Sequence, residues 1–266
     1  MNARWYGVAT AAALALLTAS TVAGQSPQAP VLLRLAPPEG QVTRYAFSMQ
    51  TDVDSPMMPA SGPLMTMRFF QTQTVLDGAG EVIRYRTTID STTMTTAMPG
   101  MDMLPDLAGS AFTTETDTRG AQLGVTDSAG LPDVPGFNME DFLQESSYFV
   151  LPEEQVSPGD SWTQGAPMSL PMGPTGSVSA EVAMTHTFVS LEGSFATISF
   201  QGPIEMEMDM GGMGASATGS ITGTMVVDLA EGRYQSQTSQ TSLDIDMGPM
   251  TMESTTTTTL ELLPDP

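Results

Sequence analysis

Apolar and polar side chains alternate along most of this chain from Gln41 onward. In the first such stretch the apolar side chains Tyr45, Phe47, Met49 and Val53 share one parity, and the polar side chains Arg44, Ser48, Gln50 and Asp52 share the other. Successive side chains of a β-strand point to opposite faces of its sheet. A period of two therefore predicts strands with one buried and one solvated face.

Turn residues divide this pattern into separate strands. The clearest turn is Asp77-Gly78-Ala79-Gly80, and Arg119-Gly120 and Glu192-Gly193 mark two more. Such residues favour hairpins between alternating segments. The predicted strands cover residues 41–53, 65–76, 81–95, 112–118, 122–126, 177–188, 195–210, 221–229, 233–247 and 250–262. Short turns between consecutive strands indicate an antiparallel meander.

The number of strands bears on the shape of the sheet. About nine or ten strands are predicted, and open sheets of this size usually curl or close. We therefore expect a mainly β fold, in which the antiparallel meander forms a strongly curved sheet, a half-barrel or a barrel.

One short inserted helix is expected between two β-rich halves, which join around residues 137–162. Asn138 is a suitable N-cap, and Glu140 and Asp141 would lie at the positive end of the helix dipole. Pro152 would stop the chain from continuing as a helix.

Two segments near the end of the chain are polar at both parities. Between Gln235 and Ser242, and between Glu253 and Thr259, Ser, Thr and Gln or Glu occupy both faces. Such strands fit a sheet edge, a hairpin projecting into solvent, or the wet wall of a cavity. The sequence leaves these three interpretations open.

The N-terminus predicts export. Arg4 precedes an apolar run from Val8 to Leu17, and small residues follow at positions 21–24. This order is typical of a secretory signal peptide, and the run is shorter than the roughly 20 apolar residues of a membrane span. We expect residues 1–24 to be a signal peptide, 25–40 a flexible N-terminal segment, and 41–263 a single β-rich domain. The alternative is a retained N-terminal anchor.

Composition narrows the function classes. The chain has no cysteine, so disulfides and thiolate metal sites are excluded, and no lipid can be attached to a thiol after the apolar run. The chain has eight arginines and 30 acidic residues, which give a net charge of -22. This charge repels nucleic acid and anionic membranes. We expect a periplasmic or secreted protein without an integral membrane span, no nucleic-acid partner, and no cofactor. The sequence leaves open whether the chain has a protein partner.

Methionine is unusually frequent, with 22 residues. Several occur as Met-x-Met, a spacing that puts both thioethers on one face of a strand. These pairs are Met65 and Met67, Met101 and Met103, Met206 with Met208 and Met210, and Met250 and Met252. Three interpretations remain open: ordinary core or pocket lining, a face that adapts to apolar ligands, and a soft Cu(I) site.

The most regular apolar faces predict a binding surface for an apolar or acyl small molecule. The predicted ligand-binding residues are Val182, Met184, His186, Phe188, Met206, Met208, Met210 and Met225. His186 is the only histidine and lies on the apolar parity of its strand, which is typical of a packed core histidine. A zinc site built from several histidines is therefore excluded.

Two weaker patterns concern catalysis and calcium. Gly159-Asp160-Ser161-Trp162 is similar to the Gly-Asp-Ser-Leu motif of hydrolases, and Ser161 with His186 would be its nucleophile and base. A β-turn that begins a strand at Trp162 explains the same residues. Acid pairs such as Asp52 with Asp54 suit Ca²⁺ but form no calcium loop.

The segment from Leu151 to Trp162, LPEEQVSPGDSW, resembles a group of exported bacterial β-rich proteins of unknown function. The resemblance implies two β-rich halves separated by this turn, and no activity. The overall plan also has a distant similarity to periplasmic lipoprotein carriers, whose half-barrels hold acyl chains.

Three function classes follow from the sequence. The first is a non-catalytic exported protein that binds an apolar or acyl ligand on a concave, Met-lined sheet face. The second is a structural or interaction protein of the cell envelope. The third is an enzyme, a hydrolase, which the scarcity of His, Lys and Cys disfavours.

Overall fold

The computed structural model describes residues 29–55, 62–97, 107–128, 131, 149–171, 177–209, 214–246, 248 and 251–264. These residues contain eleven β-strands and no helix. The strands are β1 (Val42–Asp54), β2 (Met65–Asp77), β3 (Val82–Thr96), β4 (Ala111–Asp117), β5 (Gln122–Asp127), β6 (Ser161–Pro171), β7 (Ser177–Glu192), β8 (Phe195–Asp209), β9 (Gly214–Asp228), β10 (Arg233–Asp246) and β11 (Thr251–Leu262). The mainly β, antiparallel prediction is confirmed. The predicted helix lies mostly outside the described residues; residues 149–152, where it would end, are described and form no helix.

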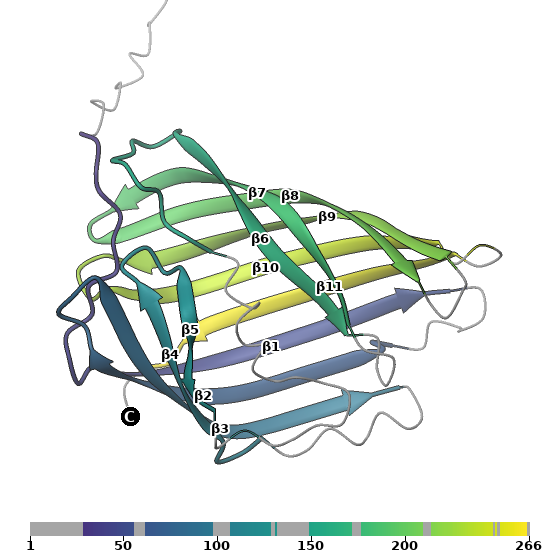
Figure 1. Ribbon diagram of the computed structural model, residues 1–266, viewed down its shortest axis with the longest axis horizontal. Helices are drawn as coiled ribbons and strands as arrows, with labels where there is room; N and C mark the ends of the chain where they lie inside the picture. The colour runs from purple at the N-terminus through teal and green to yellow at the C-terminus, as the bar shows by residue number, and fades with distance from the viewer. Residues whose placement is uncertain are drawn as a thin grey trace, which may run out of the picture.

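All eleven strands form one sheet, in the order β5-β4-β3-β2-β1-β11-β10-β9-β8-β7-β6 (Figure 1). Two meanders, β1–β5 and β6–β11, meet where the first strand pairs with the last. That pairing runs from Tyr45 opposite Leu262 to Asp54 opposite Glu253. The polar strands β10 and β11 are therefore central strands, and the sheet-edge and projecting-hairpin interpretations are wrong.

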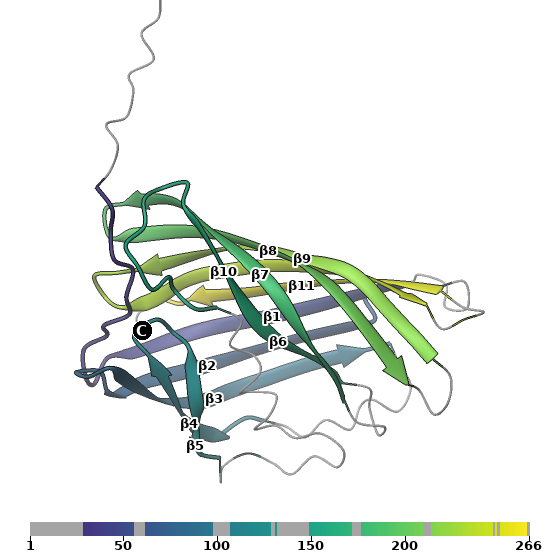
Figure 2. The same cartoon turned by 45° about the horizontal axis from the view of Figure 1, so that its top comes forward.

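The sheet is open, with β5 and β6 as its edges, and it is twisted but not strongly curled (Figure 2). The predicted strongly curved sheet, half-barrel or barrel is therefore wrong. The physical reason lies in the central strands, where Ser and Thr occupy both faces of β10 and β11. Without a continuous apolar stripe, these strands gain little by folding the sheet onto itself.

We call the face of the sheet that carries Tyr45 the inner face and the opposite one the outer face. One end of the inner face is covered by two segments without regular structure, residues 31–37 and 149–156. Together they bury a first core cluster, made of Leu33, Leu35, Val75, Ile83, Tyr85, Phe149, Leu151, Val156, Phe188, Ala196, Ile198, Met225 and Val227. Apolar burial of this kind stabilises by about 1.5–3 kcal/mol for each large side chain.

The N-terminal segment takes part in this core. Val31 pairs with Val156 in an isolated antiparallel bridge, and Leu33 and Leu35 are 0% and 2% exposed. The sequence predicts a flexible segment over residues 25–40, whereas the structure packs its second half against the sheet.

A second core cluster lies on the inner face of β7–β10. It contains Val182, Met184, Phe200, Ile204, Met206, Ala215, Ala217, Ile221 and Leu243. The ring of Phe200 lies over Gly223, where any Cβ would collide with it. This glycine therefore lets the aromatic ring lie against the neighbouring strand.

The part of the chain that the structure describes contains no helix that could span a membrane.

Candidate ligand-binding surface

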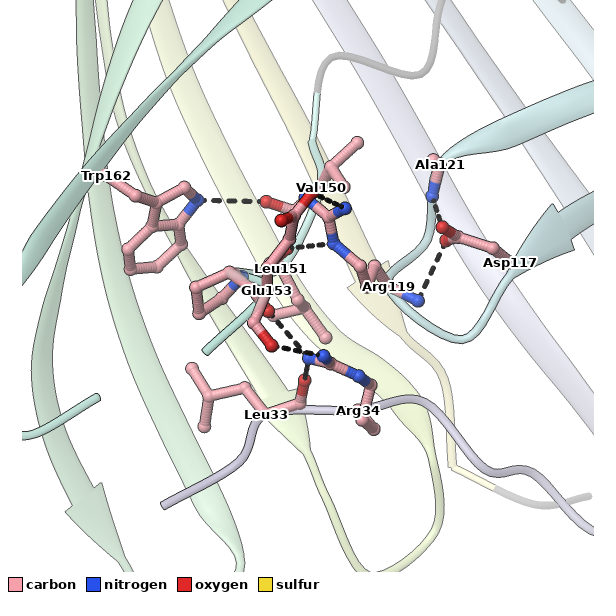
Figure 3. Close-up of polar contacts among 10 residues, drawn as sticks. Leu33, Arg34, Asp117, Arg119, Ala121, Val150, Leu151, Glu153 and Trp162 are labelled. Carbon is pink, nitrogen blue, oxygen red and sulfur yellow. Dashed lines mark hydrogen bonds and ion pairs between the residues drawn. The ribbon is translucent and has the colours of Figure 1, made fainter. Parts of the chain in front are cut away.

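Two arginines hold the covering segments in place (Figure 3). The Arg34 guanidinium donates hydrogen bonds to the carbonyl oxygens of Leu33, Pro152 and Glu153, at 2.6, 2.6 and 2.7 Å. Arg119, in the turn between β4 and β5, donates from Nε to the Leu151 carbonyl at 2.8 Å. We call these two residues and their carbonyl partners the arginine clasp. It joins three segments that are distant in sequence.

An ion pair extends the clasp. Arg119 Nη1 lies 2.9 Å from Glu153 Oε1, and the Glu153 side chain is 78% exposed. The Arg34 pKa is lowered, first because of its burial and second because Arg119 lies nearby. The turn itself is formed by Asp117, whose Oδ1 accepts hydrogen bonds from the backbone N–H groups of Arg119 and Ala121.

The Gly-Asp-Ser-Trp segment forms a turn that starts β6, so the turn interpretation is confirmed. Gly159 adopts a φ of 99°, which favours glycine. The Asp160 carboxylate accepts a hydrogen bond from the Ser157 N–H at 2.7 Å. Trp162 then donates from Nε1 to the Val150 carbonyl at 3.0 Å and so ties β6 to the covering segment (Figure 3).

Ser161 and His186 do not form a nucleophile and base. The pairing of β6 with β7 places Ser161 opposite Thr187, and Trp162 opposite His186. Neighbouring residues of a strand point to opposite faces, so the two side chains lie on different faces of the sheet. The Ser161 hydroxyl instead shares a 2.8 Å hydrogen bond with Thr187 on the outer face.

His186 lies in an aromatic enclosure on the inner face. Its ring stacks on Trp162 at 5.4 Å, meets Phe149 edge-on at 5.1 Å, and lies 6.1 Å from Phe200. The side chain is 0% exposed, and neither ring nitrogen forms a hydrogen bond of good geometry among the described residues. Burial lowers its pKa to about 4, and the Met184 backbone offsets a small part of this shift. A neutral, packed histidine results.

The sequence-predicted binding residues lie mostly in the two filled core clusters. Val182, Met184, His186, Phe188, Met206 and Met225 are all between 0% and 5% exposed. The structure does not describe the side chain of Met208 or any part of Met210. These six side chains are buried and therefore have little free surface for a ligand.

Partly exposed apolar side chains of the inner face gather elsewhere, on β1, β2 and β3. The strand register places Met49 beside Met67, and Met67 beside Met94. In the adjoining row Phe47 faces Phe69, and their rings stack at 4.4 Å with an angle of 21°. We call these five residues the Phe–Met patch. All five are intermediate in exposure, neither buried nor fully exposed.

A strip of hydroxyl groups borders the patch. Thr258 lies beside Met49 in the pairing of β1 with β11. One row further along, Thr51 and Thr256 share a 3.0 Å hydrogen bond across the same two strands. The inner face of the central strands thus places an apolar surface next to neutral polar groups.

Among the residues that the structure describes, the charges near the patch lie on the outer face. Asp52 and Asp54 have the opposite parity to Met49 and Val53 on β1, and both are exposed. On β2, Arg68 stacks its guanidinium over Phe70 at 4.9 Å, again at outer-face positions. The Phe–Met patch is therefore an uncharged surface on a strongly acidic protein.

Sequence reasoning did not identify Met49, Met94, Phe47 and Phe69 as binding residues. Phe47, Met49 and Phe69 lie on the apolar parity of their predicted strands, but the partners of those strands depend on register. Met94 has the opposite parity to Ile83, Tyr85 and Ile89, and it reaches the inner face only because the register shifts between Phe70 and Gln71. Only the structure shows that β1, β2 and β3 align these side chains across the sheet. The signal present in the sequence was the apolar parity of Phe47, Met49 and Phe69 alone.

The outer face has a shallow polar groove of about 330 Å³. It is lined by Thr222, Gly223, Thr224, Thr238, Ser239, Gln240 and Thr257. No charged or large apolar side chain is among these residues. Within the described part of the chain, no group of three or more His, Cys, Asp or Glu residues is arranged to hold a metal ion.

Comparison with known proteins gives a family likeness without an activity. Residues 138–233 match the family described as "Family of unknown function (DUF6263)". The matched segment begins before the covering residues 149–156 and ends at the start of β10. No curated protein matches the chain.

Proposed function

We propose that this protein is an exported, non-catalytic protein that binds an apolar or acyl ligand on the inner face of its sheet. The binding surface in this proposal is the Phe–Met patch together with the bordering hydroxyl strip. The predicted signal peptide at residues 1–24 and a periplasmic or secreted location are parts of the same proposal.

The partial exposure of the patch is the observation that supports binding. The two core clusters are filled, with most of their side chains less than 9% exposed, while the Phe–Met patch keeps free surface. Methionine side chains are flexible and polarizable, and they adapt to irregular apolar shapes. Burial of the remaining apolar surface by a ligand is favourable by about 25 cal/mol per Å².

The arrangement suits an acyl chain better than a fully apolar molecule. The chain would lie on Phe47, Phe69 and the methionines, and a polar headgroup would reach Thr51, Thr256 or Thr258. The absence of charge among these side chains favours a neutral headgroup. The distant similarity to lipoprotein carriers supports only one part of this proposal, namely that the ligand has an acyl chain.

Phenylalanines that are neighbours on β2 provide a matched test. Phe69 lies on the inner face within the patch, and Phe70 lies on the outer face over Arg68. The affinity for the fluorescent fatty acid cis-parinaric acid, and for a neutral monoacylglycerol that displaces it, is measured for Phe69→Gln and Phe70→Gln.

Phe69→Gln is expected to weaken binding by about tenfold or more, because an aromatic contact worth roughly 1.5–3 kcal/mol is lost. Phe70→Gln is expected to bind like the wild type. Equal effects of both substitutions, or no saturable binding by the wild type, would count against the proposal.

A further inference from the structure

Three methionines lie side by side across three adjacent strands. Met67 on β2 is the register partner of Met49 on β1 and of Met94 on β3. All three point to the inner face, because directly paired residues share a face. We call this set the methionine row. None of its pairs has the Met-x-Met spacing that the sequence displays elsewhere.

The spacing of the row allows the three sulfurs to converge. Neighbouring strands are about 4.7–4.9 Å apart, so the outer two methionines flank Met67 at roughly that distance. Each methionine has three rotatable bonds, which let its thioether lean toward the centre. Met65 lies two residues from Met67 on the same strand face and is also partly exposed, so it can supply a fourth thioether.

The surroundings of the row select a soft cation. Its register neighbours are the stacked pair Phe47 and Phe69 on one side, and Thr51, Met65 and Thr96 on the other. No carboxylate or imidazole occupies these positions, so hard cations such as Ca²⁺ and Mg²⁺ lack their preferred ligands. Thioethers instead prefer Cu(I).

The charge of the protein assists a cation at this site. The net charge is -22, and exposed acids such as Asp52 and Asp54 lie on the reverse face of β1. The negative potential raises the local concentration of cations while the row itself stays uncharged. A Cu(I) ion held by neutral thioethers keeps its positive charge, which this potential stabilises.

We infer that Met49, Met67 and Met94 form a thioether site for a single Cu(I) ion, with Met65 as an additional ligand. The site goes beyond acyl-ligand binding, because it depends on sulfur as a donor and not on apolar area.

The test uses Ag(I), a redox-inert analogue of Cu(I), and the full chain after export. Calorimetry gives the stoichiometry and affinity. NMR of methionines labelled with ¹³C at the ε-methyl group shows which side chains respond, and it requires no substitution. One equivalent is expected to bind and to shift the resonances of Met49, Met67 and Met94. Cu(I) under reducing conditions, in competition with a chromogenic chelator, is expected to give the same stoichiometry.

Two triple variants provide the matched comparison. Met49→Leu, Met67→Leu and Met94→Leu together are expected to weaken Ag(I) binding by at least about tenfold, since all donors are lost. The control replaces the buried residues Met184, Met206 and Met225 with Leu and is expected to bind like the wild type. Met-to-Leu changes conserve volume and are usually tolerated in folded proteins. The single variant Met67→Leu is a further check if the triple variant does not fold.

The inference is overturned if Ag(I) binds the first triple variant as tightly as the wild type, if the control loses binding equally, or if the shifts spread over unrelated methionines. The result separates this site from the acyl-ligand proposal. The variant Phe69→Gln keeps all four thioethers, so it is expected to bind Ag(I) like the wild type even where its binding of cis-parinaric acid is weakened.

Discussion

At the scale of single residues, His186 shows how burial changes chemistry. It is enclosed by Trp162, Phe149 and Phe200 and is 0% exposed. Its neutral form is favoured because a charged imidazolium would lose its hydration without gaining a partner. The apolar parity of this histidine was sufficient to predict a packed role. The aromatic enclosure was not predictable, because Trp162 reaches it only through the pairing of β6 with β7.

The His186 environment makes stability depend on pH in a defined window. In the unfolded chain this side chain takes up a proton near pH 6.5, whereas its pKa in the folded chain is about 4. The unfolded state therefore binds more protons between these values, and the free energy of unfolding falls as the pH is lowered from 6.5 to 4. The contribution is roughly 3 kcal/mol, and it is fully present above pH 6.5.

His186→Phe is expected to remove this contribution. Urea unfolding at several pH values measures the free energy of unfolding of both proteins, so that changes due to the carboxylates cancel in the difference. The wild type should lose stability relative to the variant between pH 6.5 and pH 4. Parallel curves over that interval would show that His186 is protonated in the folded protein or exposed.

Two glycines with similar backbone angles differ in their surroundings. Gly120 has a φ of 87°, and a Cβ there would lie 2.8 Å from Tyr234 Oη. Gly159 has a φ of 99°, with nothing within 4 Å of its Cβ position. Gly159→Ala is expected to cost about 1 kcal/mol from backbone strain alone. Gly120→Ala is expected to cost about 1–3 kcal/mol more from overpacking. Thermal unfolding measures the loss of stability in both variants. Equal losses would show that a Cβ at position 120 does not collide with Tyr234.

At the scale of elements, alternation predicted ten of the eleven strands, most of them with boundaries within one residue of those observed. The largest differences are at β9, which begins at Gly214 and not at residue 221, and at β7, which continues to Glu192. The strand without a predicted range is β6, where Gly165, Pro167 and Pro171 interrupt the pattern. Proline is tolerated there because β6 is an edge strand. The packing of residues 31–35 was also not predicted. Val31, Leu33 and Leu35 alternate with Leu32 and Arg34, but so short a segment has no strand partner of its own beyond one bridge.

The arginine clasp is expected to stabilise the covering segments locally and to leave the stability of the sheet unchanged. Arg119→Ala removes the hydrogen bond to the Leu151 carbonyl and the ion pair with Glu153, at a cost of about 1–3 kcal/mol. Hydrogen exchange of residues 149–156 should become faster, while exchange in β8 and β9 stays unchanged. The control is Arg84→Ala, whose ion pair with Glu115 joins side chains that are 48% and 28% exposed and is worth at most about 1 kcal/mol. Faster exchange throughout the sheet would contradict a local role.

At the scale of the whole molecule, the sheet depends on a pairing that the sequence does not specify. β1 and β11 are separated by about 200 residues and join two meanders at polar strands. Alternation assigns each side chain to a face but does not say which strand lies beside it. For this reason the candidate surface predicted from β7–β9 lies in filled core, while the Phe–Met patch arises from the register of β1, β2 and β3.

The same pairing explains why the sheet stays open. The hydroxyl-rich strands β10 and β11 lie between the two meanders. The first core cluster contains side chains of both meanders together with the covering segments, so these segments bury it without requiring closure. An open inner face with an uncharged apolar patch is the basis of the proposed function.

Photocrosslinking of a bound acyl chain tests that function most directly. A fatty acid carrying a diazirine in its chain is added to the full exported protein and irradiated, and the modified residues are identified by mass spectrometry. The proposal predicts labelling of Phe47, Met49, Met67, Phe69 and Met94, with competition by unlabelled monoacylglycerol. Labelling confined to outer-face residues such as Phe70, or labelling that competitor does not reduce, would contradict it.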